Sequence, residues 1–130
     1  MGLSAHTMPM KAIVLFLVGG SLYVALEYFW RGFSHVSMFI TGGVALVLLN
    51  GLATRFATLP LAALGAISAV VVTALEFVVG ALVNVRLGLR VWDYSGVRWN
   101  LYGQVCLGYS LLWFGLCVPV VAVLQLVNAI

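Results

Sequence analysis

Four long stretches of apolar residues follow one another along the chain, separated by short stretches that carry the ionic residues. They cover approximately residues 12–30, 36–54, 60–83 and 101–127. Each is close to the roughly 20 residues that an α-helix needs to cross the hydrocarbon core of a bilayer. The stretches between them are short at 31–35 and 55–59 and longer at 84–100. The pattern predicts an all-α, single-domain, multi-pass membrane protein with four helices in two hairpins, joined by a tight turn.

Composition supports lipid as the solvent. Of the 130 residues, 65% are hydrophobic and 7% are charged, whereas soluble proteins have roughly 45–50% and about 25%. The six Lys/Arg and three Asp/Glu residues give a net charge of +3. Because the basic residues are scattered and form no stripe, a main role in nucleic-acid binding is excluded.

Cysteine and histidine give no pattern of a metal or cofactor site. Cys106 and Cys117 lie in one apolar stretch, too far apart along a helix to bond each other, and are expected to be buried. His6 and His35 stand alone, without the spacing of a zinc or haem site. We therefore expect neither a metal nor a cofactor.

Polar residues are sorted toward one side of the predicted membrane domain. A short repeat contributes to this sorting, since residues 25–28 read Ala-Leu-Glu-Tyr and residues 74–77 read Ala-Leu-Glu-Phe. The first and third helices run in the same direction, so Glu27 and Glu76 fall toward the same face. On that face the sequence also places Arg31, His35, Arg86, Arg90, Asp93, Arg98, Asn100 and Gln104, while the opposite face carries Lys11, Asn50 and Arg55.

The two acids of this face differ in their local partners. Arg31 follows Glu27 by four residues, which is the favourable order for an ion pair on one helix face. Glu76 has Val79 and Gly80 at the corresponding positions, so it must reach another helix or hold a proton. Because carboxyl groups inside a membrane are costly and commonly mark ion, proton or substrate sites, Glu76 is the central candidate.

The longer loop combines aromatic and polar residues. Trp92, Tyr94 and Trp99 suit the headgroup region and are predicted to anchor the interface. Asp93 and Ser95 are expected to cap a turn or a short helix. The alternative is that Arg90, Asp93 and Arg98 close a polar pocket over Glu76.

Several motifs, spread over about residues 19–113, resemble a family of small four-helix bacterial membrane proteins known as putative ABC-transporter type IV permease components, or CmpB-like proteins. The residues that carry the resemblance are Leu26-Glu27, Trp30-Arg31-Gly32, His35, Ser37-Met38, Gly42-Gly43, Leu75-Glu76, Gly80, Asn84, Trp92-Asp93-Tyr94-Ser95, Asn100, Gly103, Cys106 and Trp113. The resemblance implies a transport role and a shared site at Glu27, Arg31, Glu76, Asn84, Asp93 and Asn100. With His35 and Arg86 from the same face, these residues form the candidate substrate- or ion-binding set.

Three classes of function stay open. A transporter or permease component is favoured, because buried acids that converge on one face are what cation-binding or ion-coupled sites require. A non-catalytic scaffold, assembly factor or phage-type lysis accessory would need the polar cluster only for folding. A lipid-modifying membrane enzyme is the least favoured, with His35, Asp93 and Glu76 as its acid–base set.

Orientation and assembly follow from charges and small residues. Arg31, Arg86, Arg90 and Arg98 outnumber Lys11 and Arg55, which predicts both hairpin turns in the cytoplasm and both termini outside the inner membrane. Small residues at 62, 65, 66, 69 and 73 favour close helix packing and a homo-oligomer. The lipid bilayer, further copies and an ATPase or another membrane subunit are the expected partners.

Overall fold

The computed structural model describes residues 7–129 and contains four long helices. They are α1 (Thr7–Arg31), α2 (Val36–Arg55), α3 (Leu61–Gly80) and α4 (Leu107–Ala129). A π-helical segment, η1 (Ala81–Arg86), extends α3 directly. All four helices are long and apolar enough to cross a membrane. His6, which the sequence sets apart as a lone histidine, lies outside the described residues.

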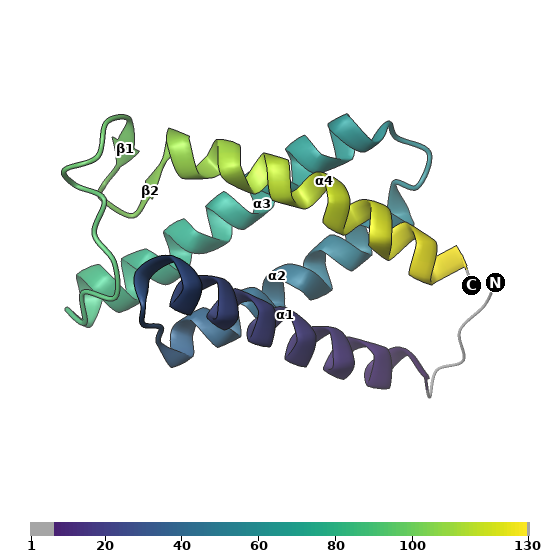
Figure 1. Cartoon of the computed structure of the whole chain (residues 1–130), viewed down its shortest axis with the longest axis horizontal. Helices are drawn as coiled ribbons and strands as arrows, with labels where there is room; N and C mark the ends of the chain where they lie inside the picture. Colours follow the sequence, from purple (N-terminus) through teal and green to yellow (C-terminus); the bar gives the residue numbers. More distant parts are fainter. Residues whose placement is uncertain (1–6, 130) are drawn as a thin grey trace.

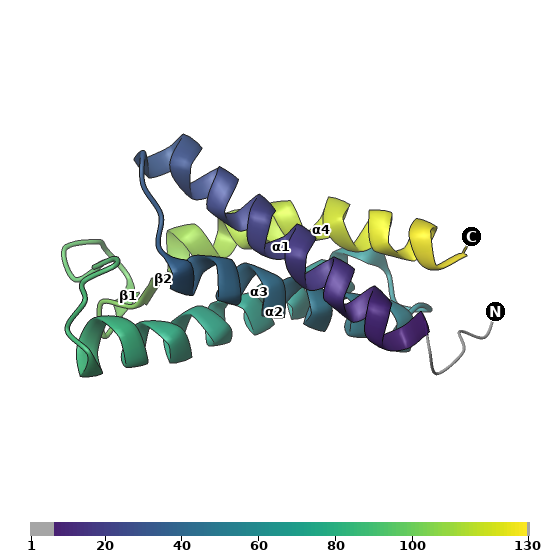
Figure 2. The same ribbon diagram turned by 90° about the horizontal axis from the view of Figure 1, so that it is seen from below.

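The helices pack as two hairpins, as predicted. α1 packs mainly against α2 and α3 packs against α4, while α2 also contacts both α3 and α4. Both hairpin connections lie at one end of the bundle, and the start of α1 and the end of α4 lie at the other end with the α2–α3 turn (Figure 1). Figure 2 shows the C-terminal end of α1 standing away from the layer that α3 and α4 form. The first helix is therefore held chiefly by its own hairpin partner.

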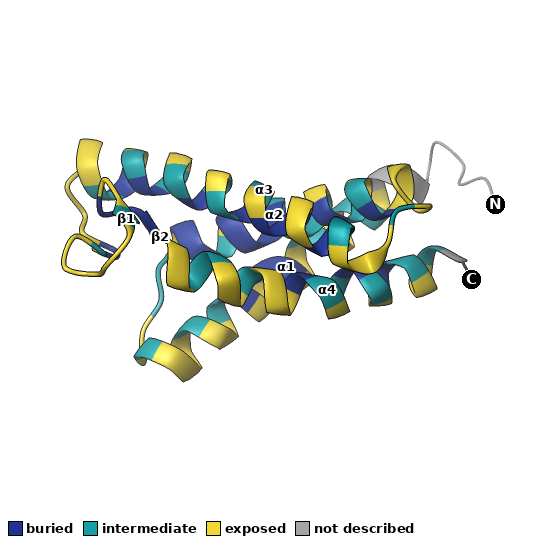
Figure 3. Cartoon of the chain, turned by 90° about the horizontal axis from the view of Figure 1, so that it is seen from above, coloured by how far each residue is buried: buried dark blue, intermediate teal, exposed yellow. Residues whose placement is uncertain are grey.

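Apolar packing fills the centre of the bundle. Leu64 and Val121 are fully buried between the hairpins, and Leu49, Val72 and Leu124 join the same cluster. Buried residues line the inner sides of the helices while exposed residues cover the outer sides (Figure 3). Many of these exposed residues are large and apolar, among them Val14, Leu17 and Val70. In a chain with four membrane-spanning helices, this is the surface that lipid covers.

The segment that precedes α4 differs from the sequence prediction. The fourth helix was expected to start near residue 101, but α4 begins at Leu107, after a short hairpin of β1 (Asn100–Leu101) and β2 (Val105–Cys106). Trp99, Tyr102 and Gly103 have φ angles of 61°, 54° and 71°. A right-handed helix cannot run through such left-handed backbone, so the apolar pattern alone placed the helix start too early.

Some of the small residues of α3 pack against other helices of the same chain. A Cβ atom added to Gly65 would collide with Val118 of α4, and Ala69 is buried as well. Close approach between α3 and α4 therefore accounts for this part of the predicted small-residue ridge.

Candidate functional site

Two clusters of hydrogen-bonded polar side chains lie at the two ends of the bundle. At the end with the α2–α3 turn, Lys11 donates a hydrogen bond to the Asn128 side chain, and Asn128 Nδ2 donates to Asn50 Oδ1 over 2.7 Å. This small network ties α1, α2 and α4 together. The end with both hairpin connections carries the two acids, and there a pocket opens.

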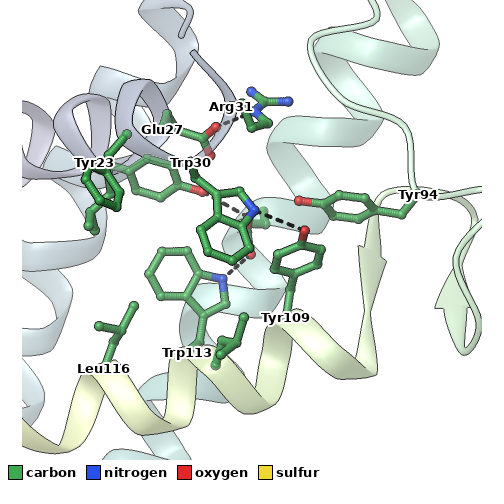
Figure 4. A pocket seen from close by; sticks show the side chains of 12 residues that line it. Tyr23, Glu27, Trp30, Arg31, Tyr94, Tyr109, Trp113 and Leu116 are labelled. Carbon is green, nitrogen blue, oxygen red and sulfur yellow. Dashed lines mark hydrogen bonds and ion pairs between the residues drawn. The ribbon is translucent and has the colours of Figure 1, made fainter. Parts of the chain in front are cut away.

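The pocket lies mainly between the C-terminal half of α1 and the N-terminal half of α4, and we call it the α1–α4 pocket. Its volume is about 380 Å³. The lining residues are Tyr23, Leu26, Glu27, Phe29, Trp30, Arg31, Glu76, Tyr94, Tyr109, Leu112, Trp113 and Leu116. Figure 4 shows their side chains converging from α1, α3, α4 and the loop before β1. The pocket exists because α1 diverges from the other helices at this end.

Glu76 is the buried acid of the pocket, with 6% of its surface exposed. Tyr23 Oη donates to Glu76 Oε2 over 2.9 Å, and Trp113 Nε1 donates to Glu76 Oε1 over 2.5 Å. The donors come from α1 and α4 and meet the acid of α3, so the carboxyl group joins the two hairpins. Hydrogen bonds of this kind are what a carboxyl group needs when it is removed from water.

Glu27 and Arg31 form the ion pair that their spacing predicts. Arg31 Nε lies 2.5 Å from Glu27 Oε2, and Arg31 Nη1 donates to the carbonyl oxygen of Val91 over 2.9 Å. The guanidinium group also lies over the ring of Phe33, at 4.4 Å. Its third nitrogen, Nη2, is buried and has no hydrogen-bond partner within residues 7–129. Arg31 thus neutralises Glu27 and fastens the end of α1 to the loop.

Five aromatic side chains surround the two acids. Tyr23 packs on Trp113 with ring centroids 5.4 Å apart, and Tyr94 stacks on Tyr109 at 5.0 Å. Trp30 reaches from α1 toward α4, where its Nε1 donates to Tyr109 Oη over 3.3 Å (Figure 4). Burial raises the pKa of the Tyr94 hydroxyl, and the negative charge of Glu76 adds to this effect. The Tyr94 hydroxyl is therefore neutral at ordinary pH.

Asn84, a candidate binding residue, holds the loop in place and does not line the α1–α4 pocket. Its Oδ1 accepts hydrogen bonds from the backbone N–H groups of Val91, over 2.7 Å, and Trp92, over 3.2 Å. Its Nδ2 donates to Gln104 Oε1 over 2.9 Å. The amide thereby holds the loop against η1.

The other candidates outside the pocket are placed as follows. His35 Nδ1 accepts from the backbone N–H of Ser37 and caps α2. Asn100 organises the hairpin, donating to the carbonyl oxygens of Ser95 and Val97 and accepting from the Gly103 N–H. Arg86 is exposed at the end of η1. The pocket thus brings together Glu27, Arg31 and Glu76. The other candidates, His35, Asn84, Arg86, Asp93 and Asn100, do not line it.

Asp93 caps a turn in the loop. Its Oδ1 accepts from the backbone N–H of Ser95 over 2.9 Å, and this hydrogen bond lowers the pKa of the carboxyl group. The capping interpretation fits this contact. Arg90, Asp93 and Arg98 are all exposed and do not line the pocket, so they do not close it over Glu76.

The three proposed interface anchors occupy different environments. Trp99 is 69% exposed, beside Arg98. Tyr94 lines the pocket instead. Trp92 is 5% exposed, because its Nε1 donates to the carbonyl oxygen of Gln104 and its ring packs with Val83 and Met38. Trp92 is therefore part of the core beneath the loop.

Sequence reasoning overlooked the aromatic residues of the pocket. The sequence required Glu76 to reach another helix or hold a proton but did not identify its partners, which are Tyr23 and Trp113. One signal pointed to Tyr23, which precedes Glu27 by four residues and so shares its helix face. Trp113 lies 37 residues from Glu76, and no local pattern connects them.

Comparisons with known proteins identify a family for the chain. A family model described as putative ABC-transporter type IV matches residues 27–129. That range covers most of the chain and includes Glu27, Arg31, Glu76 and Trp113. No curated protein and no solved structure matches the sequence.

Proposed function

Because the chain belongs to the putative ABC-transporter type IV family, we propose that it is a membrane-embedded permease component whose cargo or coupling ion binds in the α1–α4 pocket. The observation that carries this proposal is Glu76, a buried carboxyl group held by Tyr23 and Trp113 beside a cavity of about 380 Å³. A buried acid next to a cavity in a membrane protein is typical of ion and substrate sites.

The permease component acts together with other chains. Fully buried Leu64 and Val121 fill the middle of the bundle, so a pathway across the membrane has to form between this chain and another subunit. A second copy of the chain is the simplest candidate. The sequence contains no Gly-x-x-x-x-Gly-Lys-Ser/Thr motif, so ATP hydrolysis that drives transport would come from a partner ATPase.

A structural role for Glu76 is the competing function. Both carboxyl oxygens are hydrogen-bonded within the chain, and the bonds connect the two hairpins. A scaffold or assembly factor would need no more than this. Substitution of Glu76 by the isosteric amide distinguishes the two functions, because it keeps the shape and removes the charge.

Charge movement across proteoliposomes tests the permease role. The protein, alone and with its co-purifying subunits, is exposed to a panel of inorganic cations, organic amines and anions on a supported membrane. We expect at least one solute to produce a current that Glu76→Gln reduces by about tenfold or more while the protein stays folded. Trp99→Phe, at an exposed site outside the pocket, is the matched control. Equal currents from wild type and Glu76→Gln, or none from either, would favour the scaffold.

The orientation predicted from the basic residues is tested by cysteine labelling in intact cells. Cys106 and Cys117 are both buried and are first replaced by alanine. Cysteines are then introduced at the exposed positions Thr58, in the α2–α3 turn, and Ser95, in the loop before β1. These two connections lie at opposite ends of the bundle (Figure 1). With both hairpin connections in the cytoplasm of a cell whose inner membrane holds the protein, an impermeant maleimide labels Thr58→Cys only. Labelling of Ser95→Cys only would reverse the orientation.

A further inference from the structure

The geometry of the α1–α4 pocket points to a ligand class. We propose that the pocket binds a hydrophobic organic cation, such as a quaternary ammonium or phosphonium group with apolar substituents, and admits it sideways from the bilayer. This inference rests on the proposed function, since it names the chemistry of the cargo that the permease component would bind.

The first step is the charge inside the pocket. Three ionisable side chains with formal charge line it: Glu27, Arg31 and Glu76. Arg31 is paired with Glu27, and this is the salt bridge found among residues 7–129. Of the two acids that line the pocket, Glu76 is therefore the one that has no salt-bridge partner among residues 7–129. An ionised Glu76 leaves the pocket with one net negative charge, which matches a single monovalent cation.

The second step is the remaining capacity of Glu76. A carboxylate offers about four lone-pair directions, and Tyr23 and Trp113 use one each. Both donors are neutral, so they orient the carboxyl group without cancelling its charge. A cation in the cavity can therefore approach a carboxylate that is already fixed in position, with little ordering cost on binding.

The third step is the aromatic wall. Tyr23, Trp30, Tyr94, Tyr109 and Trp113 all line the pocket. The faces of such rings attract desolvated organic cations, and several rings together form the cages that recognise quaternary ammonium groups. Small inorganic cations require several oxygen ligands in place of their water shell. With Glu27 engaged by Arg31, the pocket offers them few oxygens.

The fourth step is access from lipid. Apolar side chains that are themselves exposed form the rim: Leu26, Phe29, Leu112 and Leu116, with Phe29 90% exposed. The opening between α1 and α4 is spanned by the hydrogen bond from Trp30 to Tyr109, and Trp30 is 67% exposed (Figure 4). A single contact of 3.3 Å between accessible side chains is weak and easily broken. A ligand dissolved in the bilayer could therefore pass between the helices once Trp30 moves aside.

Ammonium groups reach the bilayer from two sources, free amphiphilic cations and the headgroups of amine-bearing phospholipids. Both present the same chemistry to Glu76 and the aromatic rings. The probe is therefore radiolabelled tetraphenylphosphonium, measured with the full-length protein in nanodiscs of phosphatidylglycerol alone or mixed with phosphatidylethanolamine. Competition by phosphatidylethanolamine would assign the site to the lipid headgroup, and unchanged binding would assign it to a free cation.

The binding experiment includes matched ligands and variants. We expect saturable binding of tetraphenylphosphonium that Glu76→Gln weakens by about tenfold or more, since the amide has the same shape but no charge. Trp30→Leu, at a position that is 67% exposed, should weaken binding about threefold or more. Trp99→Leu should leave binding unchanged. Tetraphenylborate, an anion of the same shape, should bind far more weakly.

Two results would overturn the ligand class. One is binding of tetraphenylphosphonium that is not saturable or is equal in wild type, Glu76→Gln and Trp30→Leu. The other is equal binding of tetraphenylborate. The outcome is separable from that of the proposed function: a Glu76-dependent current carried by inorganic ions without phosphonium binding refutes the ligand class alone. Glu76-dependent phosphonium binding without any solute-driven current refutes transport alone.

Discussion

Replacing Glu76 with leucine should destabilise the protein by about 2–4 kcal/mol, whereas glutamine should cost less than about 1 kcal/mol. The difference arises from the two partners of the carboxyl group. Trp113 Nε1 is a donor only, and leucine leaves it buried without an acceptor. Glutamine still accepts from Trp113 through its Oε1. The Tyr23 hydroxyl, which donates to Glu76, can turn and accept from the glutamine Nε2.

Removal of the charge works against the loss of hydrogen bonds. A buried carboxylate has a large desolvation cost, and leucine abolishes it. This offset is why the expected loss is smaller than the sum of two buried hydrogen bonds to a charged group. Reversible unfolding in bicelles, followed by circular dichroism, gives the free energy of unfolding for the three proteins. Equal stability of Glu76→Leu and Glu76→Gln would mean that the link between the hairpins contributes nothing.

The same pair of substitutions bears on function. Because glutamine preserves both contacts, a loss of current or of cation binding in Glu76→Gln reports on charge and not on unfolding. Leucine cannot serve this purpose, since it disturbs the connection between α1, α3 and α4. The isosteric amide is therefore the informative variant for both proposals.

The helices could be predicted from the sequence because their signal is local. An apolar stretch of about 20 residues has few alternatives to a membrane-spanning helix, and the predicted ends of α2, for instance, lie within one residue of Val36–Arg55. The pairing of Glu27 with Arg31 was predictable for the same reason, since four residues along a helix bring side chains together.

The partners of Glu76 could not be predicted, because they depend on how the hairpins pack. Tyr23 is 53 residues from Glu76 along the chain, and hydropathy carries no information about the rotation of one apolar helix against another. Aromatic residues in an apolar sequence are equally compatible with lipid contact and with a pocket. Only the packing of α1, α3 and α4 separates Trp113, in contact with Glu76, from exposed residues such as Leu111.

The start of the fourth helix and the position of Trp92 were predicted wrongly, because side-chain hydrogen bonds replace regular backbone hydrogen bonding in this loop. Residues 87–106 are shaped by the Asn84 and Asn100 amides and by left-handed residues such as Trp99 and Tyr102. Non-glycine residues adopt such backbone only when surrounding contacts favour it. Composition therefore predicted that Trp92 and Trp99 both anchor the interface, although Trp92 is buried beneath the loop.

Gly42→Ala is expected to destabilise the protein by about 1–3 kcal/mol, through the packing of α1 on α2. A Cβ atom at Gly42 would collide with the Tyr23 Cβ atom and with the carbonyl oxygen of Gly19. The carbonyl belongs to the α1 backbone, so a side-chain rotation cannot relieve the clash and the helices must separate. The displaced residue is Tyr23, the donor to Glu76, so the damage extends to the pocket.

Gly51→Ala is the matched control within the same helix. A Cβ atom at Gly51 meets nothing within 4 Å, and alanine favours a helix over glycine by roughly 0.5–1 kcal/mol. The same glycine-to-alanine substitution should therefore increase the stability of the protein, or leave it unchanged, at position 51. At position 42 it should lower the stability. Pocket binding separates the two further, since Gly42→Ala should weaken tetraphenylphosphonium binding through Tyr23 while Gly51→Ala retains wild-type affinity. Equal unfolding free energies for the two variants would contradict the close α1–α2 contact at Gly42.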